Sequence, residues 1–198
     1  MILAEVPYRS NGKSIQFFDD HVEFKGQSFR YDDIATLVAN GSSTTHTYFG
    51  IPLARSFDGV ILFTLNNGKR HSINMNSLAM FGIPIIRNPR KSEELFPPLF
   101  DAVNSIVAWN MAQKCINAIK GGATVEVAGL TINSIAATST AKLTKKVTVI
   151  NRENYRESLV MNYSKVAVFG RLGDLLWESF WSNKNILLIP YILDAIFG

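Results

Sequence analysis

Two pairs of adjacent aspartates stand near the start of the chain, Asp19–Asp20 and Asp32–Asp33, and His21 follows the first pair. Carboxylates and an imidazole can bind a metal ion or transfer a proton when they share one face within about 5–9 Å. Neighbouring residues in a strand point to opposite sides, so only one aspartate of each pair can face a common site. Aspartate is also typical of turns, because its side chain bonds to the nearby backbone. We therefore interpret both pairs as turn residues, with a metal or acid–base site at Asp20, His21 and Asp33 as the alternative.

The other residue types that carry catalysis lack the spacing that catalysis needs. The three histidines form no HExxH pattern, and neither a G-x-S-x-G elbow nor a phosphate-binding glycine loop occurs. The single cysteine, Cys115, stands beside Ile116 in a helical pattern, which favours a structural thiol over a nucleophile. His71 alternates with Ser72 on an expected hairpin and is interpreted as a surface residue. We predict a protein that is not an enzyme, with no catalytic residue, cofactor or metal site.

Basic residues form two small groups that are candidates for contact with an anionic ligand or an acidic partner. They are Arg87, Arg90 and Lys91 in one segment and Lys142, Lys145 and Lys146 in another. Converging loops would add their charges, at about 1 kcal/mol per basic residue near an anionic membrane. Solvated loops without a ligand are the alternative. Candidates for a protein contact are apolar and flank segments expected to be flexible: Phe49, Ile51, Met80 and Phe81.

The composition is that of a folded globular protein with a weakly basic charge. Of 198 residues, 47% are hydrophobic and 18% are charged, with a formal net charge of +4. These values exclude bulk disorder, and the length suits one large domain or two small ones. The basic residues divide evenly between the two halves of the chain. Because nucleic-acid binding normally needs a basic face, we expect no nucleic-acid partner.

The N-terminal segment lacks the pattern of an export signal. Glu5 and Pro7 precede any apolar run, whereas a signal peptide carries an uninterrupted apolar stretch. The best candidate for a membrane span, 186–197, is shorter than the roughly 18 residues required and contains Pro190 and Asp194. The expected location is the cytoplasm.

The first part of the chain carries strand patterns. Apolar and polar residues alternate on both sides of Asp19–Asp20, which predicts a hairpin over 15–24, and a further strand is expected at 27–31. The segment 39–59 is rich in Gly, Ser and Thr and is expected to be a long mobile connection. Asn67–Gly68 between β-rich runs predicts a second hairpin, from residue 60 to residue 75.

From Ser92 the apolar period changes to that of a helix. Ser92 is a candidate N-cap, Gly121–Gly122 ends the pattern, and the helix is expected over 92–120. Its apolar residues point in nearly every direction, so we expect it to be covered on more than one side and to lie between two layers. Strand patterns then return. A short helix with Asn185 as N-cap and Pro190 in its first turn is expected at the C-terminus.

The two halves share an order of events: strand, tight turn, strand, hairpin and helix. "GQSFRYDDIATL" resembles the third strand and following turn of uncharacterised bacterial members of the pleckstrin-homology-like (PH-like) superfold, and "NILLIPYILDAIF" is similar to its capping helix. The resemblance implies an α+β fold in which antiparallel β-sheets form two PH-like barrel or sandwich units. A long helix, about 92–120, stands between them, and a short helix closes the chain. The implied domains are 1–120 and a shorter 121–198, as a tandem repeat.

Members of this superfold bind lipid headgroups, peptides or proteins, so the resemblance implies a binding function. Those that bind phosphoinositides carry lysines and arginines in the loop between the first two strands. There we expect Asp19–Asp20–His21 in one copy and Ala128–Gly129 in the other, and an acidic loop repels an anionic headgroup. The expected function is therefore that of a non-enzymatic binding or scaffold protein acting through protein–protein interaction, with a homo-oligomer as one form. The alternative is a peripheral membrane protein that binds anionic lipid headgroups weakly through its basic loops.

Overall fold

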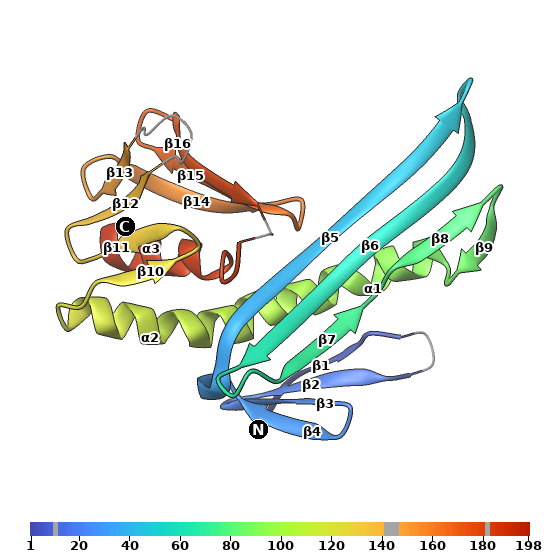
Figure 1. The fold of residues 1–198 in the computed structure, drawn as a ribbon, viewed down its shortest axis with the longest axis horizontal. Coiled ribbons are helices and arrows are strands. Elements are labelled where there is room, and N and C mark those ends of the chain that lie inside the picture. Colours follow the sequence, from blue (N-terminus) through green and yellow to red (C-terminus); the bar gives the residue numbers. More distant parts are fainter. Residues whose placement is uncertain (10–11, 141–146, 181–182) are drawn as a thin grey trace. The chain divides into compact units, whose positions relative to one another are not determined.

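The computed structural model describes residues 1–9, 12–140, 147–180 and 183–198. Among these residues the chain has the expected α+β fold, with four antiparallel sheets, one long helical segment and a short C-terminal helix (Figure 1). It divides into two compact units, Met1–Val107 and Ala108–Gly198, here named unit 1 and unit 2. The described strands of neither unit close into a barrel. The expected domain boundary after residue 120 stays a prediction.

Unit 1 begins with a four-stranded meander. Its strands are β1 (Ile2–Pro7), β2 (Ser14–Phe18), β3 (His21–Phe24) and β4 (Gln27–Arg30), each antiparallel to the next. Alternate side chains of β2 and β3 are fully buried, among them Phe17 and Val22, because one face of the sheet covers the core. The expected hairpin over 15–24 and the strand at 27–31 are confirmed.

The second sheet of unit 1 is built on a long hairpin. Its strands are β5 (Ile34–Tyr48), β6 (Ile51–Leu65), β7 (Arg70–Asn74), β8 (Ser77–Met80) and β9 (Ile83–Ile86). β6 pairs with β5 along its length, and its other edge pairs with β8 near the hairpin end and with β7 further on. The expected hairpin around Asn67–Gly68 is confirmed. The expected mobile connection over 39–59 is wrong, because threonine favours strands and this segment pairs with itself across the β5–β6 turn.

One helical segment follows without a break. It comprises α1 (Pro89–Ala102), a π-helical turn (Val103–Ala108) and α2 (Trp109–Lys120). The expected helix is confirmed, but Ser92 is not its N-cap, because the helix begins before it. Asn88 is the cap: its side-chain oxygen accepts a hydrogen bond from the Arg90 amide at 3.0 Å. Pro89 begins the helix, and proline suits the first helical position because a backbone N–H there would have no helical partner.

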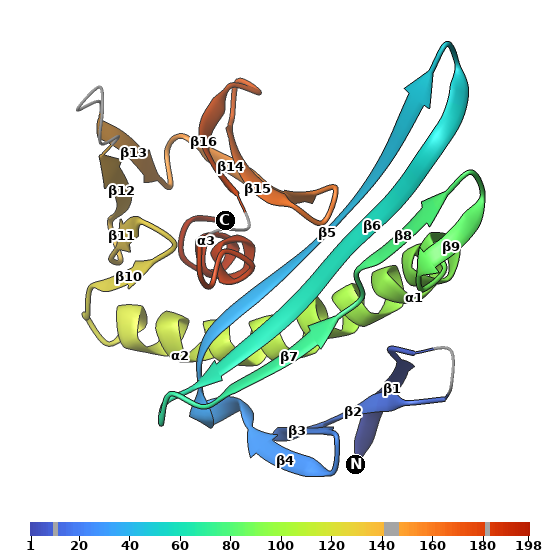
Figure 2. The same ribbon diagram turned by 45° about the vertical axis from the view of Figure 1, so that its right-hand side comes forward.

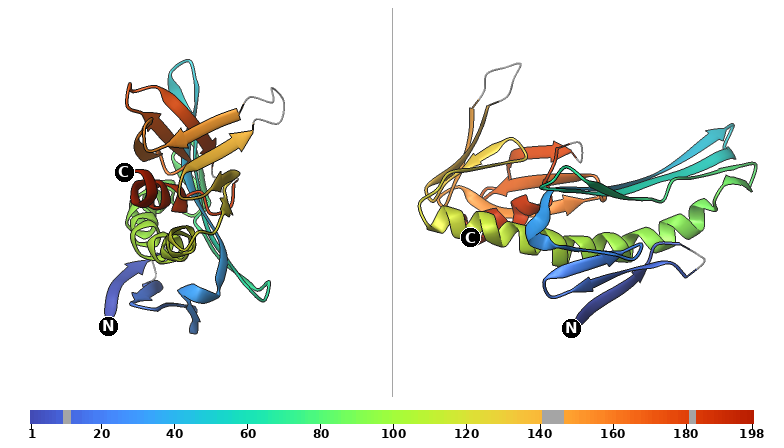
Figure 3. Two further views of the ribbon diagram at one scale, coloured as in Figure 1. Left: turned by 90° about the vertical axis from the view of Figure 1, so that its left-hand side faces the viewer. Right: turned by 60° about the horizontal axis from the view of Figure 1, so that its bottom comes forward.

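In unit 1, α1 contacts β1 of the first sheet and β5, β6 and β8 of the second (Figure 3, right). Phe96 is 1% exposed, and its ring lies against Gly41 and Gly59, which face each other in the β5–β6 pair. A Cβ atom added at Gly59 would stand 2.8 Å from the Phe96 ring, so the paired glycines leave the space that the ring fills. The hairpin and the start of α1 are thereby fixed to each other. The expected position of the whole helix between two layers stays a prediction.

Unit 2 contains two smaller sheets and two helices. The first sheet consists of β10 (Val125–Val127), β11 (Leu130–Ile132), β12 (Ala136–Thr140) and β13 (Val147–Asn151), and the second of β14 (Tyr155–Met161), β15 (Lys165–Gly170) and β16 (Leu175–Phe180). α2 packs against α3 (Leu188–Phe197), with Trp109 and Tyr191 in edge contact at 5.4 Å. Pro190 lies in the first turn of α3, as expected. Asn185 is not the N-cap, because a turn that includes it precedes the helix, which starts after Leu187.

The two units share an order of elements, and unit 1 adds to it. In both, a four-stranded sheet is followed by further antiparallel strands and then by a helix. β5 and β6 have 15 residues each, whereas β14 and β15, which hold the same place in unit 2, have 7 and 6. Unit 1 also contains β8 and β9 between β7 and its helix, beside the long hairpin in Figures 1 and 2. The assignment of either unit to the PH-like superfold stays a prediction.

Candidate anionic-ligand site

The first loop of unit 1 is not the one that the sequence predicts. β1 pairs with β2, so the loop between the first two strands runs from Tyr8 to Lys13, and Asp19–Asp20 forms the second turn. β1 is hidden in the sequence because Pro7 ends it and only one of its residues is buried. The expected acidic first loop is therefore wrong for unit 1. The loop carries Arg9 and Lys13 instead.

Arg9 lines a cavity of about 330 Å³ together with residues from the start of α1. The lining residues are Tyr8, Arg9, Met75, Arg87, Asn88, Lys91, Ser92 and Leu95. Tyr8, Met75 and Ser92 are buried, while the three basic side chains are exposed. The volume is at the lower end of the range for small-molecule pockets. A small anionic group fits this combination of buried walls and exposed cations.

The segment that precedes α1 holds the Arg87 side chain in place. Arg87 has a left-handed backbone, with φ of 49°, and its guanidinium donates a hydrogen bond to the Asn74 carbonyl at 2.6 Å. A residue other than glycine costs on the order of 1 kcal/mol in this conformation, so the hydrogen bond helps to maintain it. Lys91 lies in the first turn of α1. The N-terminus of α1 adds the positive end of the helix dipole at the same place.

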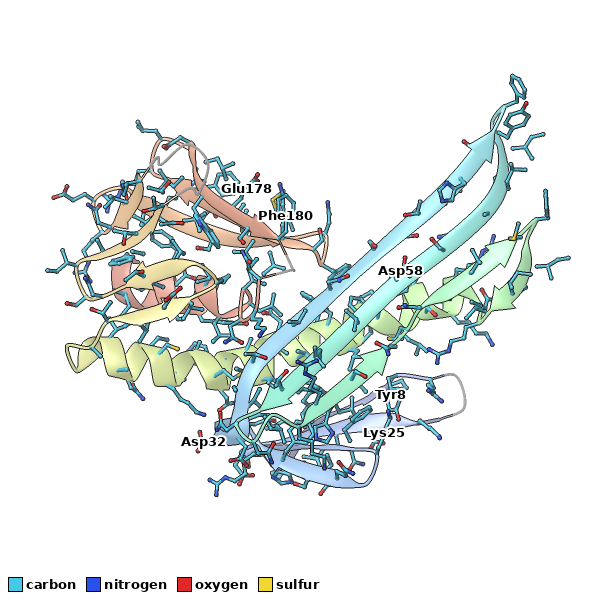
Figure 4. The ribbon with its side chains drawn as sticks, viewed as in Figure 1. Tyr8, Lys25, Asp32, Asp58, Glu178 and Phe180 are labelled. Atoms are coloured by element: carbon cyan, nitrogen blue, oxygen red, sulfur yellow. The ribbon has the colours of Figure 1, made fainter. Side chains whose placement is uncertain are left out.

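A second group of basic residues adjoins the first. Lys13 and Lys25 lie with Tyr8 and Arg9 around a shallower depression, and Figure 4 shows Tyr8 and Lys25 next to each other. Tyr8 makes an edge contact with Phe24, with ring centroids 5.2 Å apart, and the Lys25 ammonium lies 4.7 Å from the centre of the Phe24 ring. Basic residues from three segments of the chain therefore gather at one end of unit 1, here named the basic end: Arg9, Lys13, Lys25, Arg87, Arg90 and Lys91.

A carboxylate close to the basic end is already engaged. Glu93 of α1 accepts hydrogen bonds from the Ser43 hydroxyl at 2.5 Å and from the Arg55 Nε at 3.0 Å, and it also pairs with a second Arg55 nitrogen. Burial disfavours the charged form of Glu93, but these hydrogen bonds outweigh burial and lower the pKa of the carboxyl. Within the described part of the chain, no carboxylate ion-pairs with the three cations of the 330 Å³ cavity. Those cations are open to an external anion.

The structure brings together some of the basic residues that the sequence singles out. Arg87 and Lys91 share the cavity with Arg9, and Arg90 lines a neighbouring cavity that also includes Asn88. The second predicted group, Lys142, Lys145 and Lys146, lies outside the described residues, so its part in the site stays a prediction.

The sequence does not predict that Arg9, Lys13 and Lys25 belong to the site. No local pattern relates a loop near residue 9 to a helix that starts at residue 89, because only the tertiary packing of α1 against β1 brings them together. The one feature of the sequence that could indicate them is the hairpin of β1 and β2. Once β1 is recognised as a strand, the loop after it is short and basic.

The two aspartate pairs are turn residues, as expected. Asp19–Asp20 connects β2 to β3, and Asp32–Asp33 belongs to a short 3-10 turn, Tyr31–Asp33, before β5. Tyr31 holds the two turns together: its amide donates to the Asp20 carbonyl at 3.1 Å, and its hydroxyl donates to the Phe18 carbonyl at 2.7 Å. Burial, followed by the charges of the first aspartate pair, raises the pKa of Tyr31.

The residues of the alternative acid–base site lie in two places. His21 Nδ1 and Asp20 Oδ1 are 2.6 Å apart, but Asp33 lines a separate depression with other residues. Figure 4 shows Asp32 at the end of the first sheet of unit 1 that lies away from Tyr8 and Lys25, so the acidic turns and the basic end are at different ends of this sheet. Among the residues that the structure describes, no three His, Cys, Asp or Glu side chains are placed to hold a metal ion.

His71 is buried, and its expected surface position is wrong. Only 9% of the residue is exposed, because its ring stacks on Phe29 with the centroids 4.7 Å apart. Burial, with a smaller contribution from the charges of Lys69 and Lys25, lowers the pKa of His71. Cys115 is partly buried, and burial raises the pKa of its thiol, which disfavours the reactive thiolate.

The four apolar candidates are exposed and belong to two hairpin turns. Phe49 and Ile51 lie at the β5–β6 turn, and Met80 and Phe81 lie at the β8–β9 turn. A cavity of about 370 Å³ is lined by Gly82 of the β8–β9 turn, by Pro52 and Leu53 near the start of β6, and by Arg90 and other residues at the start of α1. The turns therefore adjoin the basic end. Their expected contact with a protein stays a prediction.

Comparisons with known proteins found no relative of this chain. No protein-family model, no curated protein and no solved structure matched the chain. No helix among the described residues is both long and apolar enough to cross a membrane.

Proposed function

We propose that unit 1 binds an anionic membrane surface, with lipid phosphates held at its basic end. The observation that supports this function is the gathering of Arg9, Arg87 and Lys91 around one cavity, with Lys13 and Lys25 beside it. Arginine and lysine each donate several hydrogen bonds to phosphate oxygens, and a helix N-terminus favours an anion at the same place. A cationic cavity of this size suits a phosphate group better than a neutral ligand.

The expected binding is electrostatic and moderate. Each basic residue near an anionic surface contributes about 1 kcal/mol, so five such residues contribute about 5 kcal/mol, equivalent to a Kd of about 0.2 mM. Salt screens these charges over about 8 Å at physiological ionic strength and lowers the affinity. Binding should therefore be reversible and sensitive to salt.

This function corresponds to the alternative expected from the sequence. The acidic loop that opposed a headgroup ligand is the second loop of unit 1, and the first loop is basic. The proposal includes two PH-like units in tandem, for which the shared order of elements is the support. It also includes a non-enzymatic role in the cytoplasm, where the membrane surface is anionic.

Protein–protein interaction, the leading expectation, has a different observation in its favour. β9 forms the edge of its sheet, and all of its residues, Ile83–Ile86, are exposed. An exposed apolar edge strand can pair with a strand of another chain, including a second copy. Sedimentation velocity over a range of concentrations tests it: a dimer that Ile85→Lys dissociates would support this function, and a monomer throughout would count against the homo-oligomer.

Co-sedimentation with vesicles tests membrane binding. The full chain should bind vesicles that contain phosphatidylglycerol, bind phosphatidylcholine vesicles far more weakly, and dissociate at about 1 M salt, where the Debye length is about 3 Å. Arg87→Glu/Lys91→Glu should lower the affinity about tenfold or more, because it reverses two charges of the cavity.

Arg30→Glu/Arg70→Glu is the matched control. It makes the same change in net charge, on exposed residues of unit 1 that do not line the cavity. This control should bind with an affinity close to that of the wild type. No binding to anionic vesicles at low salt, or equal losses in the two double variants, would contradict the proposed function.

A further inference from the structure

The two hairpin turns beside the basic end are built on the same four residues. Phe49-Gly50 joins β5 to β6 and Phe81-Gly82 joins β8 to β9, and the strand after each turn begins with Ile-Pro, Ile51-Pro52 in β6 and Ile83-Pro84 in β9. Phenylalanine and glycine have φ values of 47° and 78° in the first turn and of 50° and 78° in the second. In both hairpins the strand register shifts directly after the proline. The turns therefore repeat each other in sequence and in backbone conformation.

Phenylalanine is an unfavourable residue for this place in a turn. Two-residue turns with positive φ at both central positions favour Asn, Asp or Gly at the first, because a bulky side chain is strained there. Both phenylalanines are also mostly exposed, 89% for Phe49 and 70% for Phe81. Neither backbone preference nor burial within the chain accounts for phenylalanine at these positions. A contact with another molecule would account for it.

The turns form one projecting apolar surface, here named the Phe-Gly surface and defined as Tyr48–Leu53 and Met80–Ile86. It contains no charged residue. The Phe81 amide donates a hydrogen bond to the Leu53 carbonyl at 2.7 Å, which holds the second turn beside the first hairpin. Figures 1 and 2 show both hairpin ends projecting in the same direction. These are the parts that unit 1 adds to the order of elements it shares with unit 2.

Basic residues stand directly behind the Phe-Gly surface. Arg87, Arg90 and Lys91 follow Ile86 in the chain, and Arg90 lines one cavity with Pro52 and Leu53 of β6 and with Gly82 and Pro84 of the second hairpin. At about 3.3 Å per residue, Arg87 lies about 16 Å from Gly82 along the strand. An interfacial element buries its apolar part about 5–10 Å into the boundary between headgroups and acyl chains. Insertion of the β8–β9 turn to that depth leaves about 6–11 Å between the Arg87 backbone and the boundary, a gap that its extended side chain can largely span.

We propose that the Phe-Gly surface inserts into the apolar boundary of an anionic bilayer while the cations behind it contact the phosphates. This inference rests on the proposed membrane-binding function. It adds the orientation of the protein on the bilayer and the residues that move from water into the apolar boundary. Projecting turns suit a fluid apolar layer, which needs no matching groove, and Tyr48 is of the type enriched at the membrane interface. Charge disfavours a second copy of the chain as the occupant, because two copies joined here would bring the same cations together.

Tryptophan placed in a turn tests the insertion. With phosphatidylglycerol vesicles, Phe49→Trp in the full chain should emit at a shorter wavelength and should be quenched by lipids with brominated acyl chains. The wild-type chain, whose Trp109, Trp177 and Trp181 all belong to unit 2, supplies the background spectrum. Vesicle binding without a shift or quenching overturns the insertion and leaves membrane binding intact. The same shift without vesicles would indicate self-association and also overturns it.

Phe49→Asn/Phe81→Asn separates insertion from folding. Asparagine is favoured at these positive-φ positions, so the variant should unfold at the same or a higher urea concentration than the wild type. Its partition coefficient onto anionic vesicles should fall about tenfold or more, because two large apolar side chains are no longer transferred from water into the bilayer. Ile135→Asn/Leu172→Asn, which changes two exposed apolar residues of unit 2, is the control and should bind as the wild type does.

The outcomes distinguish the two proposals. Wild-type partition by Phe49→Asn/Phe81→Asn would overturn the insertion, while the salt-dependent binding and its loss in Arg87→Glu/Lys91→Glu would still support the membrane-binding function. If the wild-type chain does not bind anionic vesicles, the proposed function fails and the insertion fails with it.

Discussion

Replacing Gly41 by alanine should disrupt the packing that fixes α1 to the β5–β6 hairpin. The three atoms nearest to a Cβ built at Gly41 all belong to the Phe96 ring, with Cδ1 at 2.7 Å and Cζ at 2.9 Å. Real Cβ contacts are essentially never shorter than 3.0 Å. The Phe96 ring has little room to move away, because it also contacts Phe57 and Phe100, with centroids 5.3 Å and 5.9 Å away. Either the ring or the strand must shift.

The expected free energies follow from this contact. Overpacking a filled core costs about 1–3 kcal/mol, and removing a buried phenylalanine ring costs about 3–5 kcal/mol. In the double variant the new methyl group occupies space that the ring has left, and alanine at a residue without positive φ restricts the unfolded chain by about 0.4–1 kcal/mol. We therefore expect destabilisation of about 2 kcal/mol for Gly41→Ala, about 4 for Phe96→Ala and about 3.5 for both together, a coupling of about 2.5 kcal/mol.

Urea unfolding of the four chains, followed by circular dichroism, measures these free energies. Gly41→Ala combined with Phe17→Ala is the control, because Phe17 is buried in the other sheet of unit 1 and the two effects should add within about 0.5 kcal/mol. Additive effects of Gly41→Ala and Phe96→Ala would refute the close contact. They would also remove the support for placing the start of α1, with Arg87 and Lys91, beside the hairpin.

Three further predictions concern unit 1. Burial holds the pKa of His71 below its ordinary value of 6.5, so near that pH the unfolded chain binds a proton that the folded chain does not. The free energy of unfolding should therefore be highest above about pH 6.5 and fall as the pH drops below it. His71→Gln should remove this pH dependence from the urea midpoints. Glu93→Gln should cost about 1 kcal/mol at neutral pH, because partly exposed Arg55 loses a charged partner. That difference should vanish as the pH falls through the lowered pKa of Glu93, and equal stability of the two chains at pH 7 would contradict it. Arg87→Gly should relieve the left-handed backbone and unfold no earlier than the wild type, yet bind anionic vesicles more weakly; undiminished binding would exclude Arg87 from the site.

The elements that the sequence predicts are those whose signal lies within a few residues. Asp19–Asp20 and Asn67–Gly68 mark hairpins because turn chemistry and the alternation on either side are local. The long helix is recognisable because its period persists over many residues. Its first residue is not, since Asn88 and Ser92 are both acceptable caps and only the fold selects between them.

The elements that the sequence misses depend on distant partners. Residues 39–48 have the composition of a loop, and they form a strand because β6 pairs with them. Gly41 resembles a loop glycine, but it is the place where the Phe96 ring fits. β9 consists of exposed residues without alternation, so no periodic signal marks it.

The candidate site divides in the same way. Arg87 and Lys91 are recognisable from their types and spacing, while Arg9 joins them only through the packing of β1 against α1. The repeat of Phe-Gly-Ile-Pro can be found in the sequence. Its interpretation as a contact surface depends on the positive φ of Phe49 and Phe81, which the sequence does not show.

Hydrogen–deuterium exchange of the full chain with and without phosphatidylglycerol vesicles tests most directly whether the basic end faces a membrane. We predict slower exchange with vesicles in segments 8–13, 48–53 and 80–91. Exchange should be unchanged in segments 18–21 and 31–33, which meet at the opposite end of the first sheet of unit 1, where the Tyr31 amide donates to the Asp20 carbonyl at 3.1 Å. Protection confined to that opposite end or to unit 2, at a lipid concentration that sediments the chain, would contradict membrane binding through the basic end.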